Sequence, residues 1–250
     1  MRQVLKRIAL LDLLIPPIVG VLRSKWRDRN RPRLDIPNPE LYRPIFSPWL
    51  GGGEFGRLRD AVTARTLVSA DRLWVLYCAA KQMLAHPGDF VECGVYRGGT
   101  ARMFAELIDG NESTARRLHL FDTFAGMPAT DPDVDKHMQG DFSDTDLATV
   151  QKFVGQRPFI SWHVGRFPET FAGVPWKEIA LLHIDVDIKQ SVLDTLDHLF
   201  SKVRTGGLVI FDDYGFSSCV GARLAVDQFF SGRKEVPIVL PTGQALVIKQ

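Results

Sequence analysis

Cysteine is scarce in this sequence. Its three cysteines, Cys78, Cys93 and Cys219, are scattered through 250 residues and form no C-x-x-C pair. A dispersed, odd-numbered set argues against a disulfide framework, and it favours a reducing, cytoplasmic compartment.

Large net charge and long apolar runs are missing as well. The formal net charge of +2 gives no general attraction to nucleic acid, so we expect no nucleic-acid partner. The longest apolar run, residues 8–22, is interrupted by Asp12 and contains Pro16-Pro17. It is shorter than the roughly 20 residues of a transmembrane helix. Without repeats or low-complexity segments, 250 residues suffice for one large α/β domain or two small ones.

The apolar run lies in a basic N-terminal arm, with arginines and lysines on both sides. No A-x-A-like cleavage site follows, which argues against a signal peptide. Two interpretations stay open. The arm packs on the domain or on a second subunit of a homo-oligomer, or residues 1–33 make peripheral contact with anionic lipid at the inner face of a membrane. We expect residues 1–48 to form a partly helical arm and connection, and residues 49–250 to form one domain.

Apolar runs and helical periodicity alternate along residues 49–250, after an irregular connection at residues 37–53. The pattern predicts helices with Ser69 as the first N-cap, and an acidic lid at residues 131–146. Strands are predicted at 89–95, 118–121, 160–164, 181–184 and 207–211, helices at 68–84, 101–108, about 191–203 and 222–230, and a closing hairpin at 236–240 and 245–248. This order predicts a Rossmann-like, doubly wound, mostly parallel α/β sheet with a C-terminal antiparallel hairpin.

The dinucleotide fingerprint G-x-G-x-x-G is absent from the first strand-to-helix turn. The turn, residues 92–99, is glycine-rich, but Tyr96 stands where that fingerprint has its second glycine. Glu92 before the turn would repel a pyrophosphate and would suit a cationic or hydroxyl-bearing ligand such as S-adenosylmethionine. Asp122, at the tip of the second strand, is placed to accept hydrogen bonds from a ribose. A tight turn without a ligand is the simpler alternative.

Carboxylates follow two of the predicted strands. Asp185 ends one strand, and Asp212 and Asp213 end another. Ligands bind at the carboxyl ends of parallel strands, so these acids are expected in one crevice. Close carboxylates favour a cation between them, and an oxygen ligand set suits Mg²⁺. The alternatives are an exposed loop pair for Asp212 and Asp213, a helix N-cap for Asp187 and a packed strand histidine for His183.

Five ordered blocks resemble the macrocin-type (mycinamicin/macrocin) sugar O-methyltransferases, a family with a class I methyltransferase fold. They are DFVECGVYRGG from residue 89, FDTFAGMP from 121, GRFPETF from 165, IDVD from 184 and GGLVIFDDY from 206. The similarity runs from about Thr66 to the C-terminus. One departure is Lys189, where the family usually has Tyr.

The resemblance implies transfer of a methyl group from S-adenosylmethionine to a hydroxyl of a sugar, glycosylated natural product or glycolipid, with Mg²⁺ bound by Asp185, Asp212 and Asp213. The small-molecule or glycan acceptor itself is not identified by the motifs. The residues expected to contact S-adenosylmethionine are Thr66, Leu67, Glu92, Cys93, Gly94, Val95, Tyr96, Asp122, Thr123, Phe124, Gly126, Ser143 and Asp185.

A general base is still needed, because a sugar hydroxyl is a poor nucleophile. Asp187 and His137 are the first candidates, ahead of Lys189 and His163. Two other functions stay open. The acceptor could be a phenol or catechol, or the chain could be a non-catalytic, membrane-associated scaffold that binds the cofactor. A nicotinamide dehydrogenase is disfavoured because the fingerprint is absent.

Overall fold

A computed structural model describes residues 47–111 and 116–250 of the chain. The predicted N-terminal arm, apart from its last two residues, lies outside the described residues. All described residues belong to one unit, Pro44–Gln250. No helix within the described ranges is long and apolar enough to cross a membrane.

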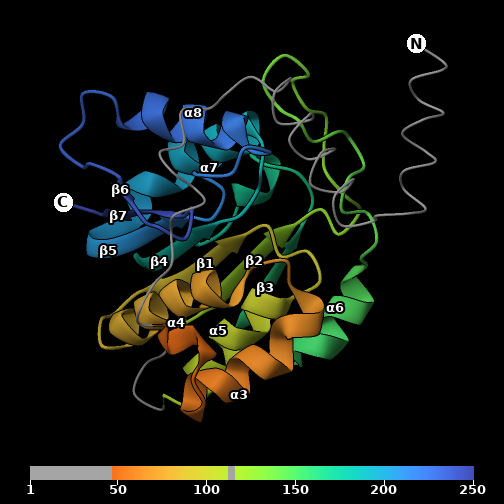
Figure 1. The fold of residues 1–250 in the computed structure, drawn as a ribbon, viewed down its shortest axis with the longest axis vertical. Coiled ribbons are helices and arrows are strands. Elements are labelled where there is room, and N and C mark those ends of the chain that lie inside the picture. Colours follow the sequence, from red (N-terminus) through yellow and green to blue (C-terminus); the bar gives the residue numbers. More distant parts are fainter. Residues whose placement is uncertain (1–46, 112–115) are drawn as a thin grey trace, which may run out of the picture. The chain divides into compact units, whose positions relative to one another are not determined.

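A seven-stranded sheet forms the centre of the fold (Figure 1), with the strand order β3-β2-β1-β4-β5-β7-β6. Its strands are β1 (Asp89–Cys93), β2 (Leu118–Asp122), β3 (Ile160–Val164), β4 (Ile179–Ile184), β5 (Val203–Phe211), β6 (Ile238–Val239) and β7 (Ala245–Ile248). The first five are parallel, and β7 pairs antiparallel with both β5 and β6. This confirms the predicted doubly wound sheet with an antiparallel C-terminal hairpin.

Helices cover both faces of the sheet. On one face lie α3 (Gly53–Val62), α4 (Ala70–Leu84), α5 (Gly99–Asp109) and α6 (Leu147–Val154), and on the other lie α7 (Lys189–Leu199) and α8 (Val220–Phe230). Every residue of β1 and β4 is buried. Strands buried on both faces are typically apolar throughout. β4 fits this pattern except for His183, whereas β1 also buries Asp89 and Glu92.

Side chains of alternate parity along β1 and β4 point to the two faces. Phe90 and Leu181 pack with the α3–α6 layer, whereas Val91 and Leu182 pack with α7 and α8. The sheet therefore separates two apolar cores. With both faces covered, the free edge at the carboxyl ends of the parallel strands is where a ligand can approach.

The predicted boundaries differ most from the structure between α7 and β5. The helix predicted at about residues 191–203 begins at Lys189 and ends at Leu199. A 3-10 turn, Phe200–Lys202, follows it, and β5 begins at Val203, before Gly206-Gly207. Val203 is β-branched and buried, and such residues fit a strand better than a helix end.

The predicted irregular connection is partly helical where the structure describes it. A 3-10 turn spans Pro48–Leu50, and α3 begins at Gly53. The helix predicted at residues 68–84 is confirmed as α4, which starts at Ala70 with Ser69 at its N-cap position. The Ser69 hydroxyl donates to Asp71 and does not cap the helix.

Candidate active site

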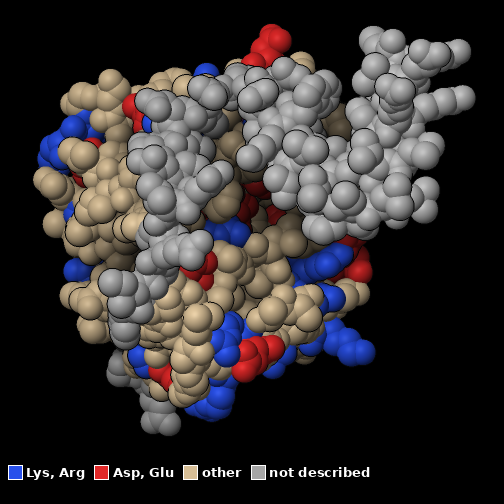
Figure 2. All heavy atoms as spheres, in the orientation of Figure 1, with Lys and Arg blue, Asp and Glu red and all other residues tan. Residues whose placement is uncertain are grey.

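A cavity of about 500 Å³ opens at the carboxyl ends of the parallel strands. Acidic side chains lie in the recess near the middle of the face shown in Figure 2. Twelve of the residues predicted from the sequence line the cavity: Thr66, Leu67, Gly94, Val95, Tyr96, Asp122, Thr123, Gly126, His137, Asp185, Asp187 and Asp213. Glu92, Cys93, Phe124, Ser143 and Asp212 are not on its wall.

The glycine-rich turn packs directly on the tip of β4. Gly94 has a left-handed backbone (φ +89°), and a Cβ atom there would lie 1.7 Å from the carbonyl oxygen of Asp185. Only glycine allows this close approach. The turn and the carboxylate-bearing tip of β4 are therefore held side by side at the floor of the cavity.

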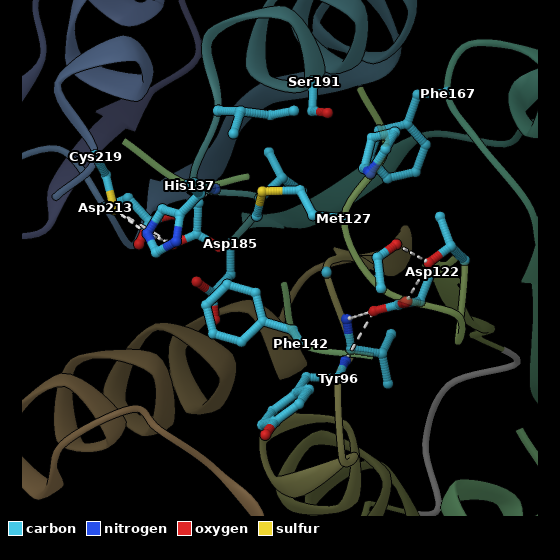
Figure 3. Close-up of a pocket in the computed structure, with 18 of the residues that line it drawn as sticks. Tyr96, Asp122, Met127, His137, Phe142, Phe167, Asp185, Ser191, Asp213 and Cys219 are labelled. Carbon is cyan, nitrogen blue, oxygen red and sulfur yellow. Dashed lines mark hydrogen bonds and ion pairs between the residues drawn. The ribbon is translucent and has the colours of Figure 1, made fainter. Parts of the chain in front are cut away.

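Asp122 joins this turn to the loop after β2. Its Oδ2 accepts hydrogen bonds from the backbone N–H groups of Val95 (2.7 Å) and Tyr96 (2.8 Å), which Figure 3 shows on the cavity wall. Its Oδ1 accepts from the N–H of Phe124 at 2.7 Å. The carboxylate thus organises two loops, and it also lines the cavity where a hydroxyl-bearing ligand would bind.

Asp185, Asp212 and Asp213 converge as the sequence predicted. Each offers a carboxylate oxygen, and these three oxygens lie within 4.8 Å of one another. Burial and the neighbouring carboxylates raise the pKa of Asp185 and of Asp213 well above the usual range. A bound cation would relieve this repulsion, and the all-oxygen donor set suits a hard ion.

Asp212 is the most heavily contacted of the three acids, and these contacts were not predicted. It is fully buried, pairs with the guanidinium of Arg72, and accepts a hydrogen bond from Gln244 Nε2 at 2.7 Å. His183 Nε2 lies 3.6 Å from its Oδ1. Although burial opposes ionisation, His183 and Arg72 lower the pKa of Asp212.

His183 and Glu92 form a fully buried pair beneath the site. Their side chains face each other from neighbouring strands, with Nδ1 and Oε1 3.0 Å apart. Burial disfavours charge on the ring, yet the interactions with Asp212 and Glu92 raise the pKa of His183 to about 10. His183 is packed within its strand, which confirms the alternative given for it in the sequence analysis. It is also the cationic partner of two carboxylates.

The predicted cofactor contacts Glu92 and Cys93 lie inside the sheet. Both side chains are fully buried in β1, and Glu92 points at His183. Phe124 and Ser143 lie behind the wall, where Ser143 packs against Gly126: a Cβ atom on that glycine would lie 2.9 Å from the Ser143 Cβ atom. Direct cofactor contact by these four residues stays a prediction.

A second cluster is formed by the base candidates His137 and Asp187 together with Cys219. Figure 3 shows His137 and Cys219 close to Asp213. Asp187 is not the N-cap of α7, because that position is held by Ile188. Its backbone N–H instead donates to Asp213 Oδ2 at 2.9 Å. Burial raises the pKa of Asp187. No sequence pattern pointed to Cys219 as part of this site.

The other two base candidates lie farther from the acids. Lys189 is the first residue of α7, and its N–H donates to Asp135 Oδ1 at 3.0 Å. His163 stacks on Phe121 in the sheet, with ring centroids 4.1 Å apart. Neither residue lines the cavity. The geometry therefore favours Asp187 and His137.

Backbone strain is concentrated around the cavity. Four non-glycine residues in the described ranges have a positive φ, namely Tyr96, Phe124, Phe142 and Asp187. Three of them line the cavity, and the fourth follows the wall residue Thr123. Strained backbone persists only where the surroundings enforce it, and it is common at functional sites.

Comparison with known proteins identifies the family of the chain. The sequence pattern of the Macrocin-O-methyltransferase (TylF) family matches residues 59–239. The chain is 31% identical over 169 residues to the 8-demethyl-8-(2,3-dimethoxy-alpha-L-rhamnosyl)-tetracenomycin-C 4'-O-methyltransferase of Streptomyces olivaceus, which covers 62% of this chain and 65% of that enzyme. It is 28% identical over 181 residues to the mycinamicin III 3''-O-methyltransferase of Micromonospora griseorubida. This match covers 66% of the chain and 70% of that enzyme. The chain thus spans about two thirds of the length of these relatives.

Solved structures share the fold. The O-methyltransferase NovP superimposes with a TM-score of 0.68 at 24% identity, over 74% of this chain and 82% of NovP. The O-methyltransferase TomG from Streptomyces achromogenes, solved in complex with SAM, superimposes with a TM-score of 0.50 at 15% identity. The match covers 85% of this chain and 94% of TomG. The fold is that of the class I O-methyltransferases.

Proposed function

The chain belongs to the macrocin O-methyltransferase family, and we propose that it transfers a methyl group from S-adenosylmethionine to a hydroxyl of a sugar or a glycosylated natural product, with Mg²⁺ in the site. The convergence of Asp185, Asp212 and Asp213 beside the glycine-rich turn is the observation that carries the proposal. The activities of the two relatives, O-methylation of a rhamnosyl-tetracenomycin-C and of mycinamicin III, support it.

The residues present fit a divalent ion. All three donors are carboxylate oxygens, which Mg²⁺ prefers over nitrogen or sulfur. The neighbouring carboxylates raise the pKa of Asp185 and of Asp213, so a cation would be stabilised among the three acids. Arg72 and Gln244 hold the side chain of Asp212 in place. When bound, the ion lowers the pKa of the acceptor hydroxyl and fixes its oxygen.

The cavity also fits S-adenosylmethionine. Its volume of about 500 Å³ lies within the usual range for small-molecule sites. Gly94 and Val95 of the turn line the cavity, and Asp122 presents a carboxylate there for ribose hydroxyls. The donor supplies a methyl group bound to a cationic sulfur. TomG, which shares this sheet, was solved with SAM.

Asp187 and His137 would remove the proton of the acceptor. The Asp187 carboxylate lies beside the metal ligands, and its raised pKa makes it a better base than an exposed aspartate. His137 Nε2 lies 3.7 Å from the Asp187 Oδ1 atom, so a proton taken by one group could be shared with the other.

Activity on defined acceptors tests the proposal. We would incubate the chain with S-adenosylmethionine and measure S-adenosylhomocysteine formation with a panel of rhamnosylated and related glycosylated acceptors, using catechol as the comparison. Turnover should require a glycosylated acceptor, stop in excess EDTA and return with Mg²⁺. Turnover that is unchanged in EDTA would overturn metal dependence, and turnover on catechol alone would overturn the sugar assignment.

A further inference from the structure

We propose that His137, Asp187 and Cys219 form a second metal site, selective for Zn²⁺, next to the three-aspartate site. Three separate segments supply the ligands: the loop between β2 and α6, the loop after β4 and the residue before α8. Their potential ligand atoms lie within 4.8 Å of one another. All three side chains line the cavity, so an ion could reach them.

The spacing of the three ligand atoms matches a tetrahedral ion. The Sγ atom of Cys219 lies 3.3 Å from Asp187 Oδ1 and 3.7 Å from His137 Nε2, and the latter two atoms are 3.7 Å apart. Zinc bonds of about 2.3 Å to sulfur and about 2.0 to 2.2 Å to nitrogen and oxygen place tetrahedral ligands roughly 3.4 to 3.6 Å apart. The atoms need to move by only a few tenths of an ångström.

A carboxylate behind His137 orients the ring for metal binding. Asp141 Oδ2 lies 3.3 Å from His137 Nδ1. A proton on Nδ1, held by this carboxylate, leaves the lone pair on Nε2 pointing at Cys219 and Asp187. Ligating histidines commonly have such a partner on the other ring nitrogen.

The other two ligands are fixed through their backbones. Asp187 donates its N–H to Asp213, and Cys219 donates its N–H to the carbonyl of Phe216 at 3.0 Å. Cys219 is buried, whereas the side chains of Asp187 and His137 are each 19% exposed. The site is therefore preformed, with one open side toward the cavity.

The donor types select against Mg²⁺. Sulfur, nitrogen and one carboxylate oxygen suit Zn²⁺, whereas Mg²⁺ prefers an all-oxygen set such as the neighbouring three aspartates. Binding converts the Cys219 thiol to a thiolate and releases its proton to solvent. Three protein ligands leave a fourth position for water or another oxygen from the cavity.

Zinc at this site would compete with the proposed chemistry. An ion bound to His137 Nε2 and Asp187 takes the electron pairs that would accept the acceptor's proton. Zinc is therefore expected to inhibit methyl transfer supported by Mg²⁺, a consequence that rests on the proposed function. The site itself does not depend on that function.

Cobalt binding tests the site without any turnover. We would remove metals from the 250-residue chain with chelator, saturate it with Mg²⁺ and titrate it with Co²⁺, which substitutes for Zn²⁺ and gives a sulfur-to-cobalt charge-transfer band. One equivalent should produce the band, and Zn²⁺ should abolish it stoichiometrically. A missing band, or displacement of cobalt by millimolar Mg²⁺, would overturn the proposal.

Matched variants assign the ligands. Cys219→Ser should eliminate the band and weaken Zn²⁺ binding by at least about 100-fold, whereas Cys78→Ser, at an exposed cysteine, should change neither. Asp141→Asn should weaken Zn²⁺ binding about 10- to 100-fold without removing a ligand. A band that survives in Cys219→Ser, or that is lost in Cys78→Ser, would place the metal elsewhere.

Discussion

Replacing Asp213 by asparagine should stabilise the metal-free protein although it removes a metal ligand. Asparagine has the same shape, and its side-chain oxygen can still accept the hydrogen bond from the Asp187 N–H group. What it removes is a buried negative charge. Burial, Asp187 and Asp185 raise the pKa of Asp213 well above its usual value, which means that the folded state disfavours the ionised form.

The size of this gain follows from the spacing of the acids. Two unit charges 4.8 Å apart, the outer limit for these ligand atoms, repel each other by about 3.5 kcal/mol at an effective dielectric constant of 20. Partial protonation of the wild-type site relieves some of that repulsion, so we expect a gain of about 1 to 3 kcal/mol. Because the folded-state pKa is raised, wild-type stability falls as the pH rises through it, and the variant's advantage should grow from pH 5 to pH 8.

Urea unfolding with and without metal measures both effects. In EDTA, Asp213→Asn should be more stable than wild type, and the exposed α7 variant Asp197→Asn should not differ. Mg²⁺ at 100 times its dissociation constant should add about 2.7 kcal/mol to the wild type and little to Asp213→Asn. Where the advantage of the variant in EDTA is below about 2.7 kcal/mol, the order of stability then reverses. A variant less stable in EDTA, or one that gains as much from Mg²⁺ as the wild type, would refute this reasoning.

Three further predictions follow from the geometry. Gly94→Ala should lower the free energy of unfolding in urea by more than about 4 kcal/mol, because its Cβ atom would lie 1.7 Å from a backbone carbonyl oxygen. Gly140→Ala, also at φ +89° but in open space, should lower it by only about 1 to 2 kcal/mol. Equal losses of stability would contradict the close approach at Gly94. Asp187→Asn should lower kcat by about 10² to 10⁴ with a smaller effect on KM in steady-state assays, and an unchanged kcat would remove Asp187 as the base. Burial lowers the pKa of His163 to about 4, so wild-type stability should decline as the pH falls from about 6.5 to 4. His163→Gln should reduce the dependence of the unfolding free energy on pH in this range. An unchanged dependence would show that His163 is not its source.

Much of the fold was predictable because its signals are local. The buried strand β4 is a short, mainly apolar run, and Asp185 and Asp212 directly follow β4 and β5. Parallel strands place their carboxyl ends on one edge, so the convergence of these acids followed from strand order alone. The glycine-rich turn was recognisable for the same reason, because Gly94 immediately follows β1.

Contacts between distant segments were not predictable in this way. Arg72 and Asp212 are 140 residues apart, and Gln244 reaches Asp212 from the loop before β7. The Glu92–His183 pair depends on the register of β1 against β4, which no single segment reveals. These side chains are the ones that compensate buried charge beneath the site.

Cys219 could not be predicted as part of the site for the same reason. A lone cysteine before a helix has no distinctive spacing, and its partners His137 and Asp187 come from loops 82 and 32 residues away. The base candidates were chosen for their residue types and positions near strand ends. Their placement beside a thiol emerges only when the three loops fold together.

Anomalous diffraction from crystals soaked in Mn²⁺, a hard ion that accepts the same oxygen ligands as Mg²⁺, tests the central claim most directly. We expect a single strong peak bounded by carboxylate oxygens of Asp185, Asp212 and Asp213, and loss of that peak in Asp213→Asn. No peak among these three residues at saturating Mn²⁺ would contradict it.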